Sequence, residues 1–109
     1  MIERITGRRE FETLSRHGRR ARTQTLWCRY LPDSTAVPAR VGFAIGRPVG
    51  GAVVRNRLRR RLRHLLTTDP QPLGHGVLLI GARPPAAERS FDQLRAELME
   101  LLLSVRSMA

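Results

Sequence analysis

Several residue types are absent from this chain of 109 residues or occur only rarely. The single cysteine, Cys28, has no partner for a disulfide within the chain, so we expect a reduced protein of the cytoplasm. Aromatic residues make up only 5% of the chain, and the core must therefore be mainly aliphatic. No segment has the length and apolar purity of a transmembrane helix, and the N-terminus lacks the apolar stretch of a signal peptide. The length predicts one compact domain, residues 1–109.

Lysine is absent as well: all 20 basic residues are arginine, and nine acidic residues leave a net charge of +11. Genomic base composition explains the absence of lysine at least as readily as a functional demand for arginine does. Residues 1–68 hold 16 arginines and four acids, whereas residues 69–109 hold four arginines and five acids. No acid occurs from Ser34 to Thr68. Such asymmetry favours a polyanionic partner, either nucleic acid or an anionic membrane.

Groups that could perform catalysis are scarce. Hydrolysis of a phosphodiester by protein-bound metal ions needs clustered carboxylates, and the arginine-rich half has almost none. Glu97 and Glu100 lie three residues apart on a predicted helix, where we interpret them as a solvated face. The remaining potential ligands show no metal-ligand spacing: Cys28, His17, His64 and His75. We therefore expect no catalytic residue in this chain and no metal or cofactor bound by it.

The strongest pattern is the run from Val54 to Leu66. Six of the nine residues from Arg55 to Arg63 are arginine, while aliphatic residues recur every three or four positions. This spacing predicts a helix with one face in the core and a cationic face outside. The predicted core face consists of Val54, Leu58, Leu62, Leu65 and Leu66.

The polar side of this helix predicts what it binds. On a helical wheel the arginines form two groups: Arg59, Arg60 and Arg63 opposite the aliphatic face, and Arg55, Arg57 and Arg61 beside it. Asn56, on the outer side, can both donate and accept, which suits a 2′-hydroxyl or a base edge. We interpret the helix as a nucleic-acid-binding element. Membrane adsorption is the alternative, but the apolar face has no Trp or Phe to anchor it.

The rest of the chain predicts short strands and two further helices. Thr6 is the predicted N-cap of a first helix that ends near His17, with Gly18 as its stop signal. Ser90 and Gln93 form a capping box before a last helix with a stripe of leucines. Strands are predicted at 25–31, 40–46 and 77–80, whereas 32–38 and 67–76 are expected to be turn and loop, and 82–87 extended chain. This order of elements predicts helices packed on a small sheet.

A few aromatic side chains are candidates for stacking on unpaired bases. We expect Phe43 to lie in the core, whereas Phe11 and Tyr30 are the better candidates and Trp27 stays open. The glycine-rich segment 46–51 includes Arg47 and matches neither a Walker loop nor a dinucleotide-binding motif. It suits a tight turn from strand to helix, and the backbone amides at the start of that helix attract anions.

The basic helix opens with an ordered motif, Gly50-Gly51-Ala52-Val53-Val54-Arg55-Asn56-Arg57-Leu58-Arg59-Arg60, followed by Arg63. Its Gly-x-Ala-Val-x-Arg-Asn-Arg core resembles the signature of the bacterial ribonuclease P protein family. Charge alone would not generate this string. Flanking segments are similar as well: Phe11, Leu14 and Gly18 in the first helix, residues 40–42, and residues 82–86.

The resemblance implies an α+β fold. The expected architecture is a compact two-layer α/β sandwich, with three helices on a small mixed sheet of four strands. The fourth strand is expected near residues 20–23. A left-handed βαβ crossover is implied through the arginine-rich helix, against the usual right-handed rule.

The resemblance also implies a function. The family assists a catalytic RNA that removes the 5′ leader from precursor tRNA, and the holoenzyme requires Mg²⁺ through that RNA. The implied partners are the catalytic RNA and the leader, with the protein a monomer in a 1:1 ribonucleoprotein. The residues assigned to the catalytic RNA are Arg55, Asn56, Arg57, Arg59, Arg60 and Arg63. Those assigned to a cleft for the single-stranded leader are Phe11, Tyr30 and Arg47.

Two positions depart from the family pattern. Pro48 stands where the family often has a second basic residue before the glycine turn, and Ser15 replaces a second aromatic residue on the first helix. Both concern the leader cleft more than the overall role. The main alternative is a general RNA-binding or chaperone protein, which would not need the ordered motif. A ribosomal protein would use basic tails, and a stand-alone nuclease would need the missing carboxylates.

Overall fold

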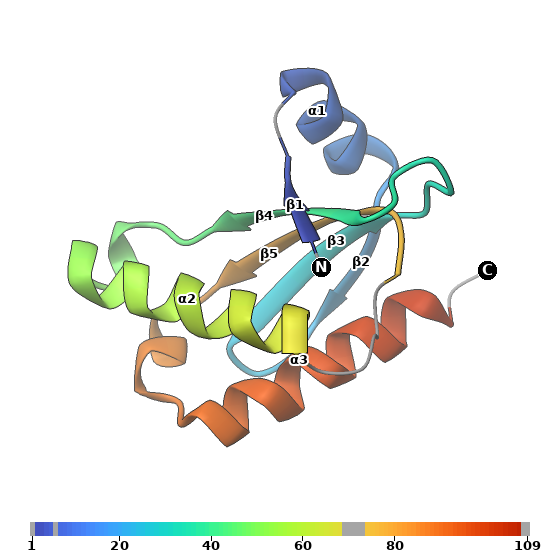
Figure 1. Ribbon diagram of the computed structural model, residues 1–109. Coiled ribbons are helices and arrows are strands. Elements are labelled where there is room, and N and C mark those ends of the chain that lie inside the picture. Colours follow the sequence, from blue (N-terminus) through green and yellow to red (C-terminus); the bar gives the residue numbers. More distant parts are fainter. Residues whose placement is uncertain (1, 6, 69–73, 108–109) are drawn as a thin grey trace.

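The computed structural model describes residues 2–5, 7–68 and 74–107. Three α-helices accompany a five-stranded mixed sheet in the order β1-β4-β5-β3-β2 (Figure 1). The strands are β1 (Ile2–Arg4), β2 (Arg19–Arg22), β3 (Leu26–Leu31), β4 (Ala39–Ala44) and β5 (Val77–Ala82). The helices are α1 (Arg8–His17), α2 (Ala52–Thr68) and α3 (Phe91–Arg106), with short 3-10 turns η1 (Arg47–Val49) and η2 (Pro84–Glu88). This confirms the predicted α+β class.

The sheet has one more strand than predicted. The expected fourth strand is β2, an edge strand antiparallel to β3. The additional strand is β1, which pairs parallel with β4 only from Ile2 opposite Ala39 to Arg4 opposite Val41. A three-residue strand is too short for an alternating pattern to reveal it. Because β1 stops at Arg4, no strand among the described residues lies beside β4 beyond Val41 on that side.

The helices cover the two faces of the sheet unequally. α2 and α3 lie on one face, where their leucines join the inward residues of β3, β4 and β5 in the main core (Figure 1). α1 lies on the opposite face, where Leu14 joins a smaller cluster with Ile5, Ala36 and Val77. The main body is therefore the predicted pair of layers, and α1 adds a partial third layer.

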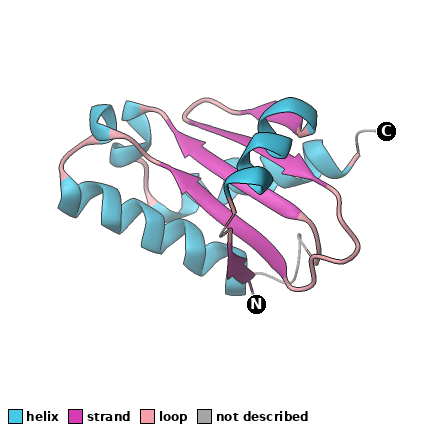
Figure 2. Cartoon of the chain, turned by 90° about the horizontal axis from the view of Figure 1, so that it is seen from above, coloured by secondary structure: helices cyan, strands magenta, loops and turns pink. Residues whose placement is uncertain are grey.

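The arginine-rich helix connects two parallel neighbouring strands. β4 and β5 pair in parallel, and α2 joins them across the face opposite α1. When the sheet is viewed from the α1 side and turned so that β4 and β5 point upward, α2 lies behind the sheet and β5 lies to the right of β4 (Figure 2). This crossover is left-handed, as predicted.

Several element boundaries differ from the predicted ones. Gly7 is the N-cap of α1 and makes no side-chain cap, while the predicted cap, Thr6, lies outside the described residues. α2 continues to Thr68, and the hydroxyls of Thr67 and Thr68 donate to carbonyls one turn back. Residues 84–88 form η2 instead of extended chain, because the fixed φ of proline suits the first positions of a helical turn. The capping box of Ser90 and Gln93 is confirmed.

An ion pair fixes α1 to the sheet. The Arg40 guanidinium donates to both carboxylate oxygens of Glu10 at 2.6–3.1 Å, and both side chains are half-buried. The hydrogen bond to Glu10 holds the pKa of Arg40 above its ordinary value. This two-pronged contact sets the position of α1 over β4.

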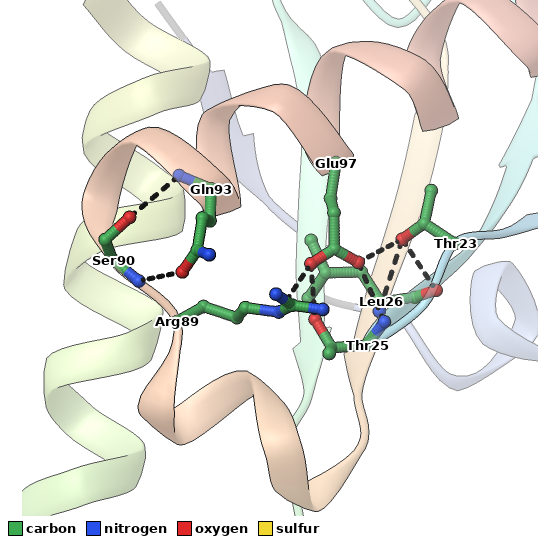
Figure 3. A network of polar contacts seen from close by, with 7 residues as sticks. All are labelled: Thr23, Thr25, Leu26, Arg89, Ser90, Gln93 and Glu97. Atoms are coloured by element: carbon green, nitrogen blue, oxygen red, sulfur yellow. Dashed lines mark hydrogen bonds and ion pairs between the residues drawn. The ribbon is translucent and has the colours of Figure 1, made fainter.

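A second polar cluster centres on Glu97 of α3 (Figure 3). Its carboxylate accepts hydrogen bonds from the Thr23 and Thr25 hydroxyls and from the Thr25 backbone N–H, at 2.6–2.7 Å. Arg89 Nε lies 3.3 Å from the carboxylate, and the Glu97 side chain is only 11% exposed. The interpretation of Glu97 as part of a solvated face is therefore wrong.

The charge state of Glu97 makes stability depend on pH. Burial acts to raise its pKa, but the hydrogen bonds from Thr23 and Thr25 and the nearby Arg89 outweigh burial, so the pKa lies below its ordinary value. The stabilisation is thus complete above the ordinary glutamate pKa and is lost as pH falls through the lower folded-state value. We expect Glu97→Gln to lower the free energy of unfolding by about 1.5–3 kcal/mol at pH 7. Urea unfolding from pH 7 to pH 3 should show this difference shrinking; a constant difference would contradict the assignment.

Candidate RNA-binding surfaces

The outer face of α2 presents the predicted cations to solvent. Leu58, Leu62, Leu65 and Leu66 are buried, which confirms the predicted core face apart from Val54, which is half-buried. Asn56, Arg57, Arg60 and Arg63 are exposed, whereas Arg55, Arg59 and Arg61 are half-buried. The first turn of α2 contains no acid. We define the arginine face as the six polar residues assigned to RNA binding on this helix: Arg55, Asn56, Arg57, Arg59, Arg60 and Arg63.

The turn before α2 depends on one glycine. Gly50 has φ of 154°, and a Cβ there would lie 2.8 Å from Cγ1 of Val54. Glycine is thus required both for the backbone conformation and for the close approach of the helix. The turn places Arg47, which is exposed on η1, just before the arginine face.

One flank of the arginine face reaches the open part of the β4 edge. Arg59 Nη1 donates to Asn56 Oδ1 at 2.6 Å, and the Arg63 guanidinium lies 5.4 Å from the centre of the Phe43 ring. Arg59 and Arg63 line a hollow of about 210 Å³ together with Phe11. Phe43 is half-buried and packs against the main core, as predicted. This flank therefore joins α2 to the side of the sheet that carries α1.

A second basic surface lies on the α1 side of the sheet. On β2 and β3, Arg20 pairs with Arg29 and Arg22 with Trp27, and the Arg29 guanidinium lies 5.8 Å from the Trp27 ring centre. Together they line an open hollow of about 510 Å³. Arg29 Nη1 also donates to Ser15 Oγ on α1 at 3.1 Å. We call Arg20, Arg22, Trp27 and Arg29 the tryptophan surface.

Of the aromatic residues assigned to the cleft, Phe11 is accessible and Tyr30 is buried. Phe11 is 40% exposed, and its ring lies over Gly42 of β4. Tyr30 is only 4% exposed, and its hydroxyl donates to the His75 carbonyl at 2.9 Å. Burial raises the pKa of Tyr30. The prediction that Tyr30 offers a stacking platform is wrong, because alternate residues of β3 face opposite sides of the sheet.

The same alternation places Trp27 and Arg29 on the accessible side. The charge of Arg29 is the signal that marks this side of β3 in the sequence, and Trp27, two residues earlier, must share it. Trp27 lies directly over Gly81 of β5, where a Cβ would come within 2.0 Å of the indole ring. The absence of a side chain at Gly81 therefore leaves the space that the indole ring of Trp27 occupies.

Gly81→Ala is expected to lift Trp27 off the sheet. The added methyl group would occupy the space of the indole ring, and Trp27 is the only tryptophan in the chain. We expect the fluorescence emission of the folded variant to shift to longer wavelength and acrylamide quenching to increase. Gly74→Ala is a suitable control, because a methyl group added at Gly74 would meet no atom within 4 Å. Unchanged emission in Gly81→Ala would contradict this packing.

The described residues offer little equipment for catalysis. Cys28 is buried, and burial raises its pKa to about 11, so the thiol is a poor nucleophile. Among residues 2–5, 7–68 and 74–107 there is no group of three Asp, Glu, His or Cys side chains that could hold a metal ion. In the same part of the chain no helix is long and apolar enough to cross a membrane. The fold and the two basic surfaces are those of an α+β protein suited to binding a polyanion such as RNA.

The particular family follows from comparison with known proteins. The family model described as Ribonuclease P matches residues 2–106. The ribonuclease P protein component of a Nocardioides species is 45% identical over 98 residues, which cover 87% of this chain and 84% of the relative. That of Thermobifida fusca is 40% identical over 110 residues, covering 94% and 75%. This chain belongs to the ribonuclease P protein family.

Solved structures agree with the fold. The ribonuclease P protein from Thermotoga maritima superposes with a TM-score of 0.82 at 22% identity, covering 98% of this chain and 99% of that one. The Staphylococcus aureus ribonuclease P protein gives 0.81 at 20% identity, covering 95% and 94%. Membership of the family makes this chain the accessory protein of a tRNA-processing endoribonuclease whose catalytic centre lies in RNA.

Proposed function

We propose that the arginine face binds the catalytic RNA and that the opposite side of the sheet binds the 5′ leader of precursor tRNA. The arginine face supports the first part, because Arg57, Arg60 and Arg63 are exposed and α2 contains no acid to neutralise them. Arginine offers a planar set of donors that grips phosphate through two bonds. Asn56 adds a group that both donates and accepts, which suits a 2′-hydroxyl.

The tryptophan surface supports the second part. Single-stranded RNA is bound by grooves that combine cations with aromatic rings on which bases stack. Trp27 supplies the ring and Arg29 the adjacent cation, while Phe11 offers a second ring at α1. We therefore assign the leader to Phe11, Trp27, Arg29 and Arg47, with Trp27 in place of the buried Tyr30. Ser15 contributes by holding Arg29 through its hydroxyl.

The division explains how a protein without its own catalytic centre aids catalysis. Contacts to the leader exist only with precursor tRNA, so they tighten substrate binding without tightening product binding. The holoenzyme requires Mg²⁺, which we assign to the RNA. The protein acts as a monomer in a 1:1 ribonucleoprotein in the cytoplasm.

Two observations test this proposal. Cleavage of precursor tRNA should be measured at low Mg²⁺ with protein alone, catalytic RNA alone and both together; we expect efficient cleavage only with both. The holoenzyme should also bind precursor more tightly than mature tRNA, and Trp27→Ala should reduce that preference by about tenfold, the worth of one stacked base. Cleavage by the protein alone, or an unchanged preference in Trp27→Ala, would contradict it. A chaperone would accelerate annealing of unrelated RNAs equally well.

A further inference from the structure

Glu97 holds together segments that are far apart in sequence. It lies on α3, yet its carboxylate accepts from Thr23 and Thr25 in the turn between β2 and β3 (Figure 3). Thr25 is completely buried, and its backbone carbonyl accepts from Arg83 N–H at 2.8 Å. Arg89, just beyond η2, approaches the same carboxylate. One buried carboxylate thus ties the β2–β3 turn and the segment after β5 to α3.

The turn held by Glu97 carries part of the tryptophan surface. Arg22 immediately precedes Thr23, and Trp27 follows Thr25 by two residues. Arg22 and Trp27 pair with each other across the turn. The turn itself is closed by Thr23 N–H donating to the Leu26 carbonyl at 2.8 Å and by Leu26 N–H donating to Thr23 Oγ1. Thr23 Oγ1 donates in turn to Glu97. Any change in this carboxylate therefore acts first on the residues that place Arg22 and Trp27.

Besides Glu97, the turn is held by Leu26, which is completely buried in the main core, and by the bond from Arg83 N–H to the Thr25 carbonyl. Gln24 is exposed, and β2 is an edge strand with a neighbour on one side only. Arg20 and Arg22 lie on the α1 side of β2. Ser15 of α1 accepts hydrogen bonds from Arg20, through its carbonyl, and from Arg29, through its hydroxyl. The end of the hairpin with Arg22 and Trp27 lies beyond that contact and rests on Gly81 and on the Glu97 cluster.

We propose that Glu97 is a positioning residue for the leader-binding surface, acting through Thr23 and Thr25 on Arg22 and Trp27. This inference rests on the proposed leader binding. Glu97 lies on the far side of the sheet from the indole and touches no RNA. Its effect is to keep the guanidinium of Arg22 and the ring of Trp27 at a fixed spacing, so that a phosphate and a base are bound together without prior ordering of the hairpin.

The experiment uses the full chain assembled with the catalytic RNA. Thr25→Val removes the hydroxyl that donates to Glu97 while keeping the shape of the side chain, and Thr25→Ser keeps the hydroxyl. Glu97→Gln removes the charge. Val105→Ala is the stability control, because this buried residue of α3 packs in the core away from the turn. For each variant we would measure unfolding, affinity for the catalytic RNA, the preference for precursor over mature tRNA, and the fluorescence anisotropy of Trp27.

We expect Glu97→Gln and Thr25→Val to lower the precursor preference by about tenfold, equal to one lost charge-assisted contact, and to lower the anisotropy of Trp27. Affinity for the catalytic RNA should stay unchanged. Thr25→Ser should restore both properties, and Val105→Ala should alter unfolding alone.

Two outcomes overturn the inference while leaving the proposed leader surface in place. In one, Glu97→Gln keeps the precursor preference although Trp27→Ala loses it; the leader surface then stands and only the positioning role fails. In the other, Val105→Ala lowers the preference as much as Glu97→Gln does, which reduces Glu97 to a general stabiliser. If Trp27→Ala itself has no effect, the proposed leader surface is wrong, and the inference falls with it.

Discussion

The double variant Arg57→Ala, Arg60→Ala is expected to bind the catalytic RNA about 10- to 100-fold more weakly, with little change in thermal stability. Both side chains are exposed on the outer face of α2, so their removal leaves the core intact. Each loses charge-assisted hydrogen bonds to phosphate, and each 1.4 kcal/mol of lost binding is about a factor of ten. Filter binding of the radiolabelled catalytic RNA would measure the affinity, and thermal unfolding would report the fold.

A matched double variant separates position from charge. Arg8→Ala, Arg16→Ala removes the same charge from exposed sites on α1. If net charge alone attracted the RNA, both double variants would weaken binding equally, and that result would contradict a specific role for the arginine face. We expect the α1 variant to stay within about twofold of the unmodified protein, as distant exposed charges are screened at physiological salt.

The salt dependence of the same binding reaction counts the phosphates engaged. With about six contacts to unpaired RNA, the logarithm of the affinity should fall with the logarithm of salt at a slope of roughly −4. Removing Arg57 and Arg60 should make that slope shallower by about 1.4. A slope near zero in the unmodified protein would argue against an electrostatic interface.

The parts of the fold that could be predicted are those with local signals. The helical spacing of the leucines on α2, the capping box of Ser90 and the apolar run at 77–80 each report on their own neighbours in sequence. The ordered motif at the start of α2 then indicates the family, and with it the crossover and the residues assigned to the catalytic RNA. These inferences do not require knowing which distant residues meet.

The errors concern contacts between distant segments. The sequence favours a solvated face for Glu97 because nothing near it shows that Thr23 and Thr25, more than 70 residues earlier, complete its hydrogen bonds. Tyr30 is a natural candidate for the cleft, although it belongs to the buried side of β3. Both sides of that strand carry large side chains, so apolar character alone does not decide which is buried. Only the charge of Arg29 indicates which side of β3 is open. The aromatic ring of Tyr30 favours the opposite assignment.

The two faces of α2 have separable tasks, which clarifies why the helix mixes arginine and leucine so densely. The leucines fix the helix to β4, β5 and α3 within one core, and this anchoring sets the direction of the arginines. A flexible basic segment would lose conformational entropy when it binds RNA, whereas a packed helix has already lost it during folding. The conformational entropy lost in ordering the arginine face is therefore offset by core packing during folding, and it does not weaken RNA binding.

Leu62→Ala tests this separation from the other side and should lower the free energy of unfolding by about 2–5 kcal/mol. Leu62 is completely buried in the main core, so the shorter side chain leaves a cavity between α2 and the sheet. Val53→Ala is the control on the same helix, because Val53 is 80% exposed, and its loss should change stability by less than about 0.5 kcal/mol. Urea unfolding would measure both. At low temperature, where Leu62→Ala remains folded, its affinity for the catalytic RNA should match that of the unmodified protein; a loss of affinity as large as that of the double arginine variant would mean that the arginine face depends on fine details of core packing.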